Sequence, residues 1–265
     1  MEAKPKAWAS EYAEWFELAS VVARYDLRPP YPAETVDVLT SLVDPANQRV
    51  LDAGCGLGDL ARPLARLVAS VDAVDRSEAM LSWGRRLPGA GANLRWVLGG
   101  IEDAPLAELY GLVVCGDSIH WFDWPVAFER SRRCLASQGN LAVVQRHSRL
   151  GDMNTERLAE LYAEHSANRH FVALDPVTAL ERRGLFAKSG SHTTAAVAWR
   201  PTMSELIGCH HSQNGFALEK MDDPAAFDLA GARGHRFTRG RRRWQVRPEP
   251  RRDHHLGSTS SAGGS

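Results

Sequence analysis

The glycine-rich segment Asp52-Ala53-Gly54-Cys55-Gly56-Leu57-Gly58 carries the clearest chemical signal in the chain. It follows a short apolar run at 49–52 and precedes a helix expected over 60–68. Glycines at a strand-to-helix turn allow tight turning and let the backbone approach a ligand closely. Asp75 stands 21 residues after Gly54, the interval expected between such a loop and an acid that binds ribose hydroxyls. The pattern predicts a nucleotide-type cofactor, and the alternative is a βα turn that binds nothing.

The spacing of the glycines separates two classes of cofactor. A dinucleotide fingerprint has the form G-x-G-x-x-G, which would place its third glycine at Asp59, an acid facing the pyrophosphate. Asp59 therefore disfavours NAD. The form actually present, G-x-G-x-G preceded by Asp52, resembles motif I of the class I S-adenosylmethionine-dependent methyltransferases.

This resemblance covers about residues 20–150 and is closest to the methyltransferase type 11 group, with its trans-aconitate methyltransferase-like and UbiE-like branches. Val71 to Leu81 looks like the second motif, whose final acid holds the cofactor ribose. Asp117 to Phe122 resembles the fourth-strand motif with its His-Trp pair, and Tyr25 to Pro32 resembles the R-P-x-Y-P segment that packs over the cofactor. Gly99 to Asp103 is similar to the segment that frames the adenine. Many members have an acid where Gly100 stands, so Ile101 and Glu102 would supply the adenine environment here.

The resemblance implies S-adenosyl-L-methionine as the cofactor. The residues that it places at the cofactor are Tyr25, Asp52, Gly54, Cys55, Gly56, Gly58, Asp75, Arg76, Met80, Ile101, Glu102, Asp117 and Ser118.

Methyl transfer from a sulfonium is an in-line displacement in which the protein mainly positions the nucleophile. A general base helps a hydroxyl or carbon nucleophile, whereas a carboxylate or amine needs none. His120, just past the fourth strand, is the candidate base, and its alternative role is structural, beside Trp121. Asp117 would contact the cofactor's amino group or a substrate cation, or cap a helix. Cys55 is interpreted as a small packing residue because no base is placed near it.

Four further side chains are candidates for substrate contact. Arg28 would bind a substrate carboxylate or only tie the N-terminal segment to the domain. Trp121 would form a wall of the pocket or pack beneath it. His210 and His211, on a proposed lid helix, would reach the substrate or form a solvated surface pair. Neither these histidines nor the scattered cysteines have metal-ligand spacing, so no metal is expected.

The elements that must position these residues alternate between short apolar strands and helices. Strands are expected at 49–52, 70–74, 94–98, 112–115 and 141–144, with helices at 60–68, 77–86 and 125–135. The expected fold is therefore α/β and Rossmann-like: a doubly wound, mostly parallel sheet with helices on both faces and a helical lid insertion after strand 5. We expect a helical cap at 1–45, including a helix over Trp8–Val22, and a cofactor-binding core at 46–150. A lid or substrate region with a sixth strand at Thr193–Ala198 follows at 151–230, and a basic, disordered tail at 231–265.

Composition and charge bound the function. The 265 residues are 44% hydrophobic and 24% charged, values typical of a globular chain with a full core. The formal net charge of zero divides into +7 for residues 231–265 and −7 for the rest, so the body of the chain does not attract polyanions. There is no apolar run of about eighteen residues, and Met1 to Pro5 contain no hydrophobic h-region, so we expect neither membrane spanning nor secretion. The four cysteines have no pairing pattern. We expect a cytoplasmic protein without membrane contact, as a monomer or homodimer.

The sequence thus favours a methyltransferase that acts on a small-molecule acceptor at a carboxylate or hydroxyl oxygen. Carbon methylation in a quinone or natural-product pathway is the runner-up. A nucleic-acid-binding protein that uses the basic tail, or a catalytically inactive cofactor-binding protein, is the alternative from another class, and nucleic acid is disfavoured by the acidic body.

Overall fold

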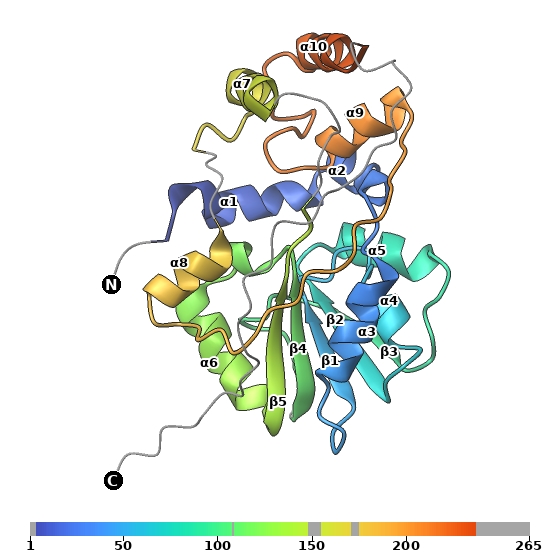
Figure 1. Cartoon of the computed structure of the whole chain (residues 1–265), viewed down its shortest axis with the longest axis vertical. Helices are drawn as coiled ribbons and strands as arrows, with labels where there is room; N and C mark the ends of the chain where they lie inside the picture. The colour runs from blue at the N-terminus through green and yellow to red at the C-terminus, as the bar shows by residue number, and fades with distance from the viewer. Residues whose placement is uncertain (1–3, 108, 148–154, 171–174, 237–265) are drawn as a thin grey trace.

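A five-stranded, wholly parallel sheet forms the centre of the molecule, with its strands in the order β3-β2-β1-β4-β5 (Figure 1). The computed structural model describes residues 4–107, 109–147, 155–170 and 175–236. The strands are β1 (Arg49–Ala53), β2 (Ser70–Asp75), β3 (Leu94–Leu98), β4 (Tyr110–Gly116) and β5 (Leu135–Val144). All five lie where the sequence predicts them. β5 begins earlier than expected, directly after the preceding helix, and its register against β4 shifts between Tyr110 and Leu112.

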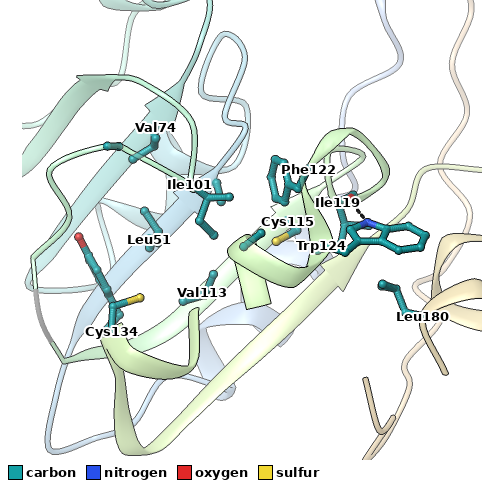
Figure 2. Packing of buried hydrophobic residues seen from close by; sticks show 14 of the residues in the cluster. Leu51, Val74, Ile101, Val113, Cys115, Ile119, Phe122, Trp124, Cys134 and Leu180 are labelled. Carbon is teal, nitrogen blue, oxygen red and sulfur yellow. Dashed lines mark hydrogen bonds between the residues drawn. The ribbon is translucent and has the colours of Figure 1, made fainter. Parts of the chain in front are cut away.

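Helices cover both faces of this sheet, which confirms the doubly wound prediction. Successive residues of β1 point to opposite faces: Val50 packs with Leu64 on one side, and Leu51 packs with Trp124 on the other. The first face carries α3 (Ala33–Ser41), α4 (Ala61–Leu64) and α5 (Glu78–Arg86), and the second carries α6 (Trp124–Cys134) and α8 (Pro176–Arg182). Figure 2 shows the second face, where the Trp124 indole N–H donates to the Ile119 carbonyl at 2.8 Å.

Side-chain caps set several helix starts. The Ser77 hydroxyl accepts from the Met80 N–H at the start of α5, and Asp175 caps α8. Thr202 and Glu205 form a capping box at the start of α9 (Met203–His211). Serine, threonine and aspartate at these positions satisfy N–H groups that the first helical turn leaves unpaired.

The prediction of one helix over Trp8–Val22 is wrong. The segment contains two short helices, α1 (Ser10–Ala13) and α2 (Ala19–Val22), with 3-10 helices at Lys6–Trp8, Glu14–Glu17 and Tyr25–Leu27. The backbone is extended at Ala9 and Leu18, and each extended residue breaks the helical hydrogen-bond pattern. The breaks let the chain follow the surface of the core, so that side chains such as Trp8 are buried. α4 is also shorter than the helix predicted for 60–68.

The remaining helices α7 (Thr155–His165), α9 and α10 (Pro224–Arg236) lie together beyond the carboxyl ends of the strands (Figure 1). They pack around Leu161, Phe216, Met221 and Phe227. Within the described ranges, no helix combines the length and the apolar character that a membrane span needs.

Two expectations for the C-terminal half are corrected. The predicted sixth strand, Thr193–Ala198, forms no strand, because residues 186–202 belong to no helix or strand. Almost all of its side chains are exposed, and the segment is held instead by Glu34, which accepts from His192 at 2.7 Å and from the Ala195 N–H at 2.6 Å. α10 ends at Arg236, so residues 231–236 are helical rather than a disordered tail. Residues 237–265 lie outside the described residues, and the tail stays a prediction.

Candidate active site

A cleft opens at the carboxyl ends of four neighbouring strands. Gly54 follows β1, Asp75 ends β2, Gly99 follows β3 and Gly116 ends β4, and all four residues line the cleft. The chain winds outward in opposite directions from β1 and β4. Parallel sheets bind ligands at such a switch point because the connections diverge there and leave a crevice. We call the strand-end residues of this cleft its floor.

The glycine loop brings its backbone against the fourth strand's loop. Gly54 has a φ of +70°, and a Cβ atom built there would lie 2.5 Å from the Ser118 Cβ. The Ser118 hydroxyl is itself fixed, because it donates to the Ala53 carbonyl at 2.6 Å. Only glycine fits this conformation and this approach. The loop therefore gives a ligand direct access to the backbone.

Asp75 joins the second strand to the glycine loop. Its carboxylate accepts from the Gly56 N–H at 2.8 Å and from the Ser77 N–H at 2.9 Å. Burial raises the pKa of Asp75 above its ordinary value, and the two backbone donors act in the opposite direction. The side chain lines the cleft, where its remaining lone pairs can accept hydrogen bonds from ligand hydroxyls.

Asp52 is a buried acid beneath the same loop. It accepts a hydrogen bond from the Ala61 backbone, yet its Oδ2 atom has no partner among the described residues. Burial raises the pKa of Asp52 to about 7. Buried polar atoms nearly always have a partner, so an unpaired carboxylate oxygen indicates a missing donor or cation. A ligand with an ammonium group beside the glycine loop would supply one.

The opposite side of the cleft, its roof, comes from the N-terminal segment. Ser10, Ala13, Phe16, Glu17 and Tyr25 line it, and Trp121 and Phe122 form a wall beside them. The Phe16 ring meets the Trp121 ring edge-on at 5.5 Å and the Tyr25 ring at 6.3 Å. The roof is thus mainly aromatic, a composition that suits a planar or apolar ligand.

Polar contacts hold this roof against the helical part of the chain. The Ser20 N–H donates to the Glu219 carboxylate at 2.9 Å, and the Ser20 hydroxyl donates to it as well. The Arg28 guanidinium stacks on Tyr25 at 4.0 Å and donates to the Ser212 hydroxyl at 3.0 Å. Residues almost 200 positions apart therefore shape one side of the cleft.

Comparisons with known proteins agree with this architecture. Residues 50–139 match the family model described as a methyltransferase domain. A methyltransferase of Mycobacterium tuberculosis, itself uncharacterized, is 36% identical over 137 residues, which cover 50% of this chain and 54% of that protein. A Dictyostelium discoideum protein provisionally named a methyltransferase is 23% identical over 203 residues, covering 72% of this chain and 74% of its own.

Residues 50–139 of this chain form a methyltransferase domain of the class I S-adenosylmethionine-dependent type. A solved structure from Anaeromyxobacter dehalogenans, provisionally named a type II methyltransferase, has the same fold. Its TM-score is 0.61 at 22% identity, over 80% of this chain and 90% of that one. The chain spans about half the length of the Mycobacterium relative.

The domain's cofactor, S-adenosylmethionine, fits the floor of the cleft. The glycine loop brings Gly54 into the lining, Asp75 offers acceptors for ribose hydroxyls, and Asp52 offers an unpaired buried acid beneath the loop. The structure places these predicted cofactor residues in the lining: Tyr25, Gly54, Asp75, Arg76, Met80, Ile101, Asp117 and Ser118.

The other predicted cofactor residues lie beneath or beside the lining. Cys55 is buried, and burial raises the pKa of its thiol well above the ordinary value, which fits packing rather than nucleophilic chemistry. Glu102 turns toward Arg76, which it binds at 2.9 Å. A Cβ at Gly100 would lie 2.3 Å from the Glu102 carboxylate, so this ion pair fills the space that a side chain at position 100 would need.

Asp117 is held by three hydrogen bonds from Arg146 and Tyr31. Its carboxylate accepts from the Arg146 guanidinium at 2.8 Å, from the Arg146 N–H at 3.0 Å and from the Tyr31 hydroxyl at 3.0 Å. It does not cap the following 3-10 helix, Ile119–Trp121, which has Ser118 at that position. The predicted helix-capping role is therefore wrong, because the side chain turns toward Arg146 instead.

His120 lies just outside the cleft lining. Its ring packs between Trp8 at 5.7 Å and Trp121 at 4.5 Å. Burial lowers the pKa of His120 to about 4, so its imidazole is neutral at neutral pH. Trp121 itself lines the cleft as expected of a wall residue. The role of His120 as a base stays a prediction.

The other predicted substrate residues point elsewhere. Arg28 is bound to Ser212, as expected for a residue that ties the N-terminal segment to the domain. His210 and His211 are buried rather than a solvated pair, because α9 turns them into the helical cluster: His210 contacts the Tyr162 hydroxyl at 2.9 Å, and His211 contacts the Phe216 carbonyl at 2.8 Å. Neither histidine lines the cleft.

Sequence reasoning missed most of the roof. Ser10, Ala13, Phe16 and Glu17 line the cleft, and none of them belongs to a recognisable motif. The concentration of aromatic residues over 8–16 was the available signal. The same concentration of aromatic residues is equally typical of the buried face of a helix, so it did not identify a cleft lining.

Proposed function

We propose that this chain transfers the methyl group of S-adenosylmethionine to an oxygen, hydroxyl or carboxylate, of a small-molecule acceptor. The observation that carries the proposal is the cleft itself. We assign the acceptors on its floor to the cofactor, and its aromatic roof adds a second set of side chains, Phe16 and Trp121 among them, beside that floor.

Oxygen as the acceptor atom is supported by two relatives with short matches. The malonyl-[acyl-carrier protein] O-methyltransferase of Halalkalibacterium halodurans is 33% identical over 82 residues, 30% of its length. The mitochondrial ubiquinone biosynthesis O-methyltransferase of Schizosaccharomyces pombe is 30% identical over 87 residues, 32% of its length. One of these names gives an acyl substrate and the other a quinone pathway.

When bound, the cofactor supplies an electrophilic methyl group on a sulfonium. The protein's part is to hold and orient: Asp75 would bind the ribose, Asp52 would attract the ammonium group, and the glycine loop would bring its backbone to the cofactor. Tyr25 would pack over the cofactor, while Phe16 and Trp121 would hold the acceptor and exclude water. Fixing two reactants at near-attack distance can lower the activation barrier by roughly 7–11 kcal/mol. Positioning can therefore account for catalysis here, because the cofactor itself supplies the reactive methyl group.

Calorimetric titration with S-adenosylmethionine and S-adenosylhomocysteine tests the cofactor half of the proposal. Asp75→Ala should weaken binding at least about tenfold, or 1.4 kcal/mol, because the ribose acceptor is removed. Asp72→Ala is the matched control: it lies on the same strand, but its carboxylate binds Arg95 at 2.7 Å, away from the cleft. Equal loss of affinity in both variants, or no binding by the folded wild type, would refute the proposal.

A further inference from the structure

The charges that face the cleft without a partner of opposite sign are negative. Glu17 and Asp75 line it, whereas Asp117 is paired with Arg146 at 2.8 Å, and Arg76, the single cationic side chain among the described lining residues, is paired with Glu102 at 2.9 Å. Glu17 stands on the exposed rim of the roof. Such a surface attracts a cationic cofactor and repels an anionic acceptor.

Every arginine at or near the cleft already has an acceptor in the protein. Arg76 binds Glu102 at 2.9 Å, Arg28 donates to Ser212 and stacks on Tyr25, and Arg146 pairs with Asp117 at 2.8 Å. A bidentate guanidinium is the usual protein partner of a buried carboxylate. The described part of this chain presents none at the cleft that is uncommitted to a protein group.

The roof offers aromatic surface in place of cations. Phe16 meets both Tyr25 and Trp121 edge-on, and Phe122 lies beside Trp121 in the lining. Ring edges and faces set at such angles bind another ring through offset and edge-to-face contacts. A carboxylate moved from water to this surface would lose its hydration with little in exchange.

We infer that the acceptor is an uncharged molecule whose hydroxyl is carried on an aromatic ring, and that the ring lies against Phe16 and Trp121. The inference rests on the proposed function and narrows its two oxygen acceptors to one. The hydroxyl oxygen forms the new bond to the methyl carbon, the carbon–sulfur bond breaks, and its electron pair stays on sulfur as the neutral thioether. The hydroxyl proton leaves to water at the open rim beside Glu17.

Matched sets of ring compounds test this directly. Each set carries a hydroxyl, a carboxylate or an aminomethyl group at the same ring position, and the three are titrated into protein saturated with S-adenosylhomocysteine. The hydroxyl member should bind at least about tenfold more tightly than the carboxylate member, and only it should receive labelled methyl from S-adenosylmethionine. A carboxylate or amine that binds as tightly as the hydroxyl, or a panel in which no ring hydroxyl binds, overturns the inference.

Two variants test whether the roof causes the preference for the hydroxyl member over the carboxylate member. Glu17→Gln should raise the affinity for the carboxylate member by about threefold, because one rim charge is removed. Phe16→Leu should weaken the hydroxyl member about fivefold through lost ring contact, with the dissociation constant of S-adenosylhomocysteine unchanged. Phe128→Leu, the same exchange on α6 outside the lining, should change neither. Unchanged ring affinity in Phe16→Leu overturns the placement.

Cofactor binding distinguishes failure of the proposed function from failure of the ring-hydroxyl inference. Absence of S-adenosylhomocysteine binding by folded wild-type protein would remove the proposed function itself. Normal cofactor binding with preferred methylation of carboxylates would leave that function standing and overturn only the ring-hydroxyl acceptor.

Discussion

Replacement of Asp52 by asparagine should make the stability of the ligand-free protein less dependent on pH. Burial raises the pKa of this carboxyl from 3.8 to about 7. A tenfold change in an acid dissociation constant corresponds to about 1.36 kcal/mol, so ionising Asp52 in the folded state costs about 4 kcal/mol at most. The unpaired Oδ2 atom is the structural origin of that cost, because nothing in the described residues compensates the buried charge.

The direction of the change in stability with pH follows from proton binding. Between about pH 4 and pH 7 the folded protein keeps the Asp52 proton and the unfolded chain loses it, so stability falls as pH rises through this window. The raised pKa of Asp75 acts in the same direction. Asp72 acts oppositely, since its lowered pKa reflects stabilisation that is lost only when the pH falls into the acidic range. The contribution of Asp52 is therefore the difference between wild type and Asp52→Asn.

Urea unfolding from about pH 5 to about pH 8 measures that difference. The wild type should lose about 2.7 kcal/mol more than Asp52→Asn over this range, because only the two pH units from about 5 to 7 fall inside the window, with the loss nearly complete near pH 7. Asp37→Asn, on the exposed side of α3, should follow the wild-type curve. Parallel curves for wild type and Asp52→Asn would show that the carboxyl finds a partner in solution and that the reasoning from its burial is wrong.

Three further substitutions probe single contacts. Gly54→Ala should lower the free energy of unfolding by about 2–4 kcal/mol, from the left-handed backbone and the 2.5 Å approach to Ser118; urea unfolding measures this, and calorimetry should show S-adenosylmethionine binding lost. Arg28→Ala should lower the free energy of unfolding by about 1.5–3 kcal/mol, because the charged hydrogen bonds to Ser212 are lost. The measurements are a lower thermal midpoint and faster proteolysis of the roof. Trp124→Phe should lower the free energy of unfolding by about 1–2 kcal/mol, because the buried Ile119 carbonyl loses the indole N–H that donates to it at 2.8 Å. Urea unfolding measures this change as well.

The core could be predicted from the sequence because its signals are local. β3 has the predicted bounds, and α5 matches the helix predicted for 77–86, with Ser77 as its cap. Continuous apolar runs mark strands buried on both faces, and a capping residue marks a helix start. The glycine loop and Asp75 were also predictable, since their spacing reflects one strand-helix-strand unit.

The wrong predictions share a different cause: the structure of these segments depends on contacts with residues far away in the sequence. The run Thr193–Ala198 has strand-forming residues, but no neighbour in the described sheet pairs with it, and Glu34 holds the segment in place. His210 and His211 look like a surface pair until α10 is packed against them through Phe227. Propensity cannot report such tertiary partners.

The division between floor and roof also explains why similarity to other methyltransferases identifies the cofactor more firmly than the acceptor. The matched family region, 50–139, contains every floor residue of the glycine loop and strand ends. Phe16 and Glu17 lie before that region, and Glu219, which holds Ser20 and with it the roof, lies after it. A site whose cofactor side is built by one local unit and whose acceptor side is built by remote segments can change its acceptor without disturbing the cofactor. For this reason the aromatic, cation-poor roof of this chain bears on the identity of the acceptor more directly than its similarity to other methyltransferases does.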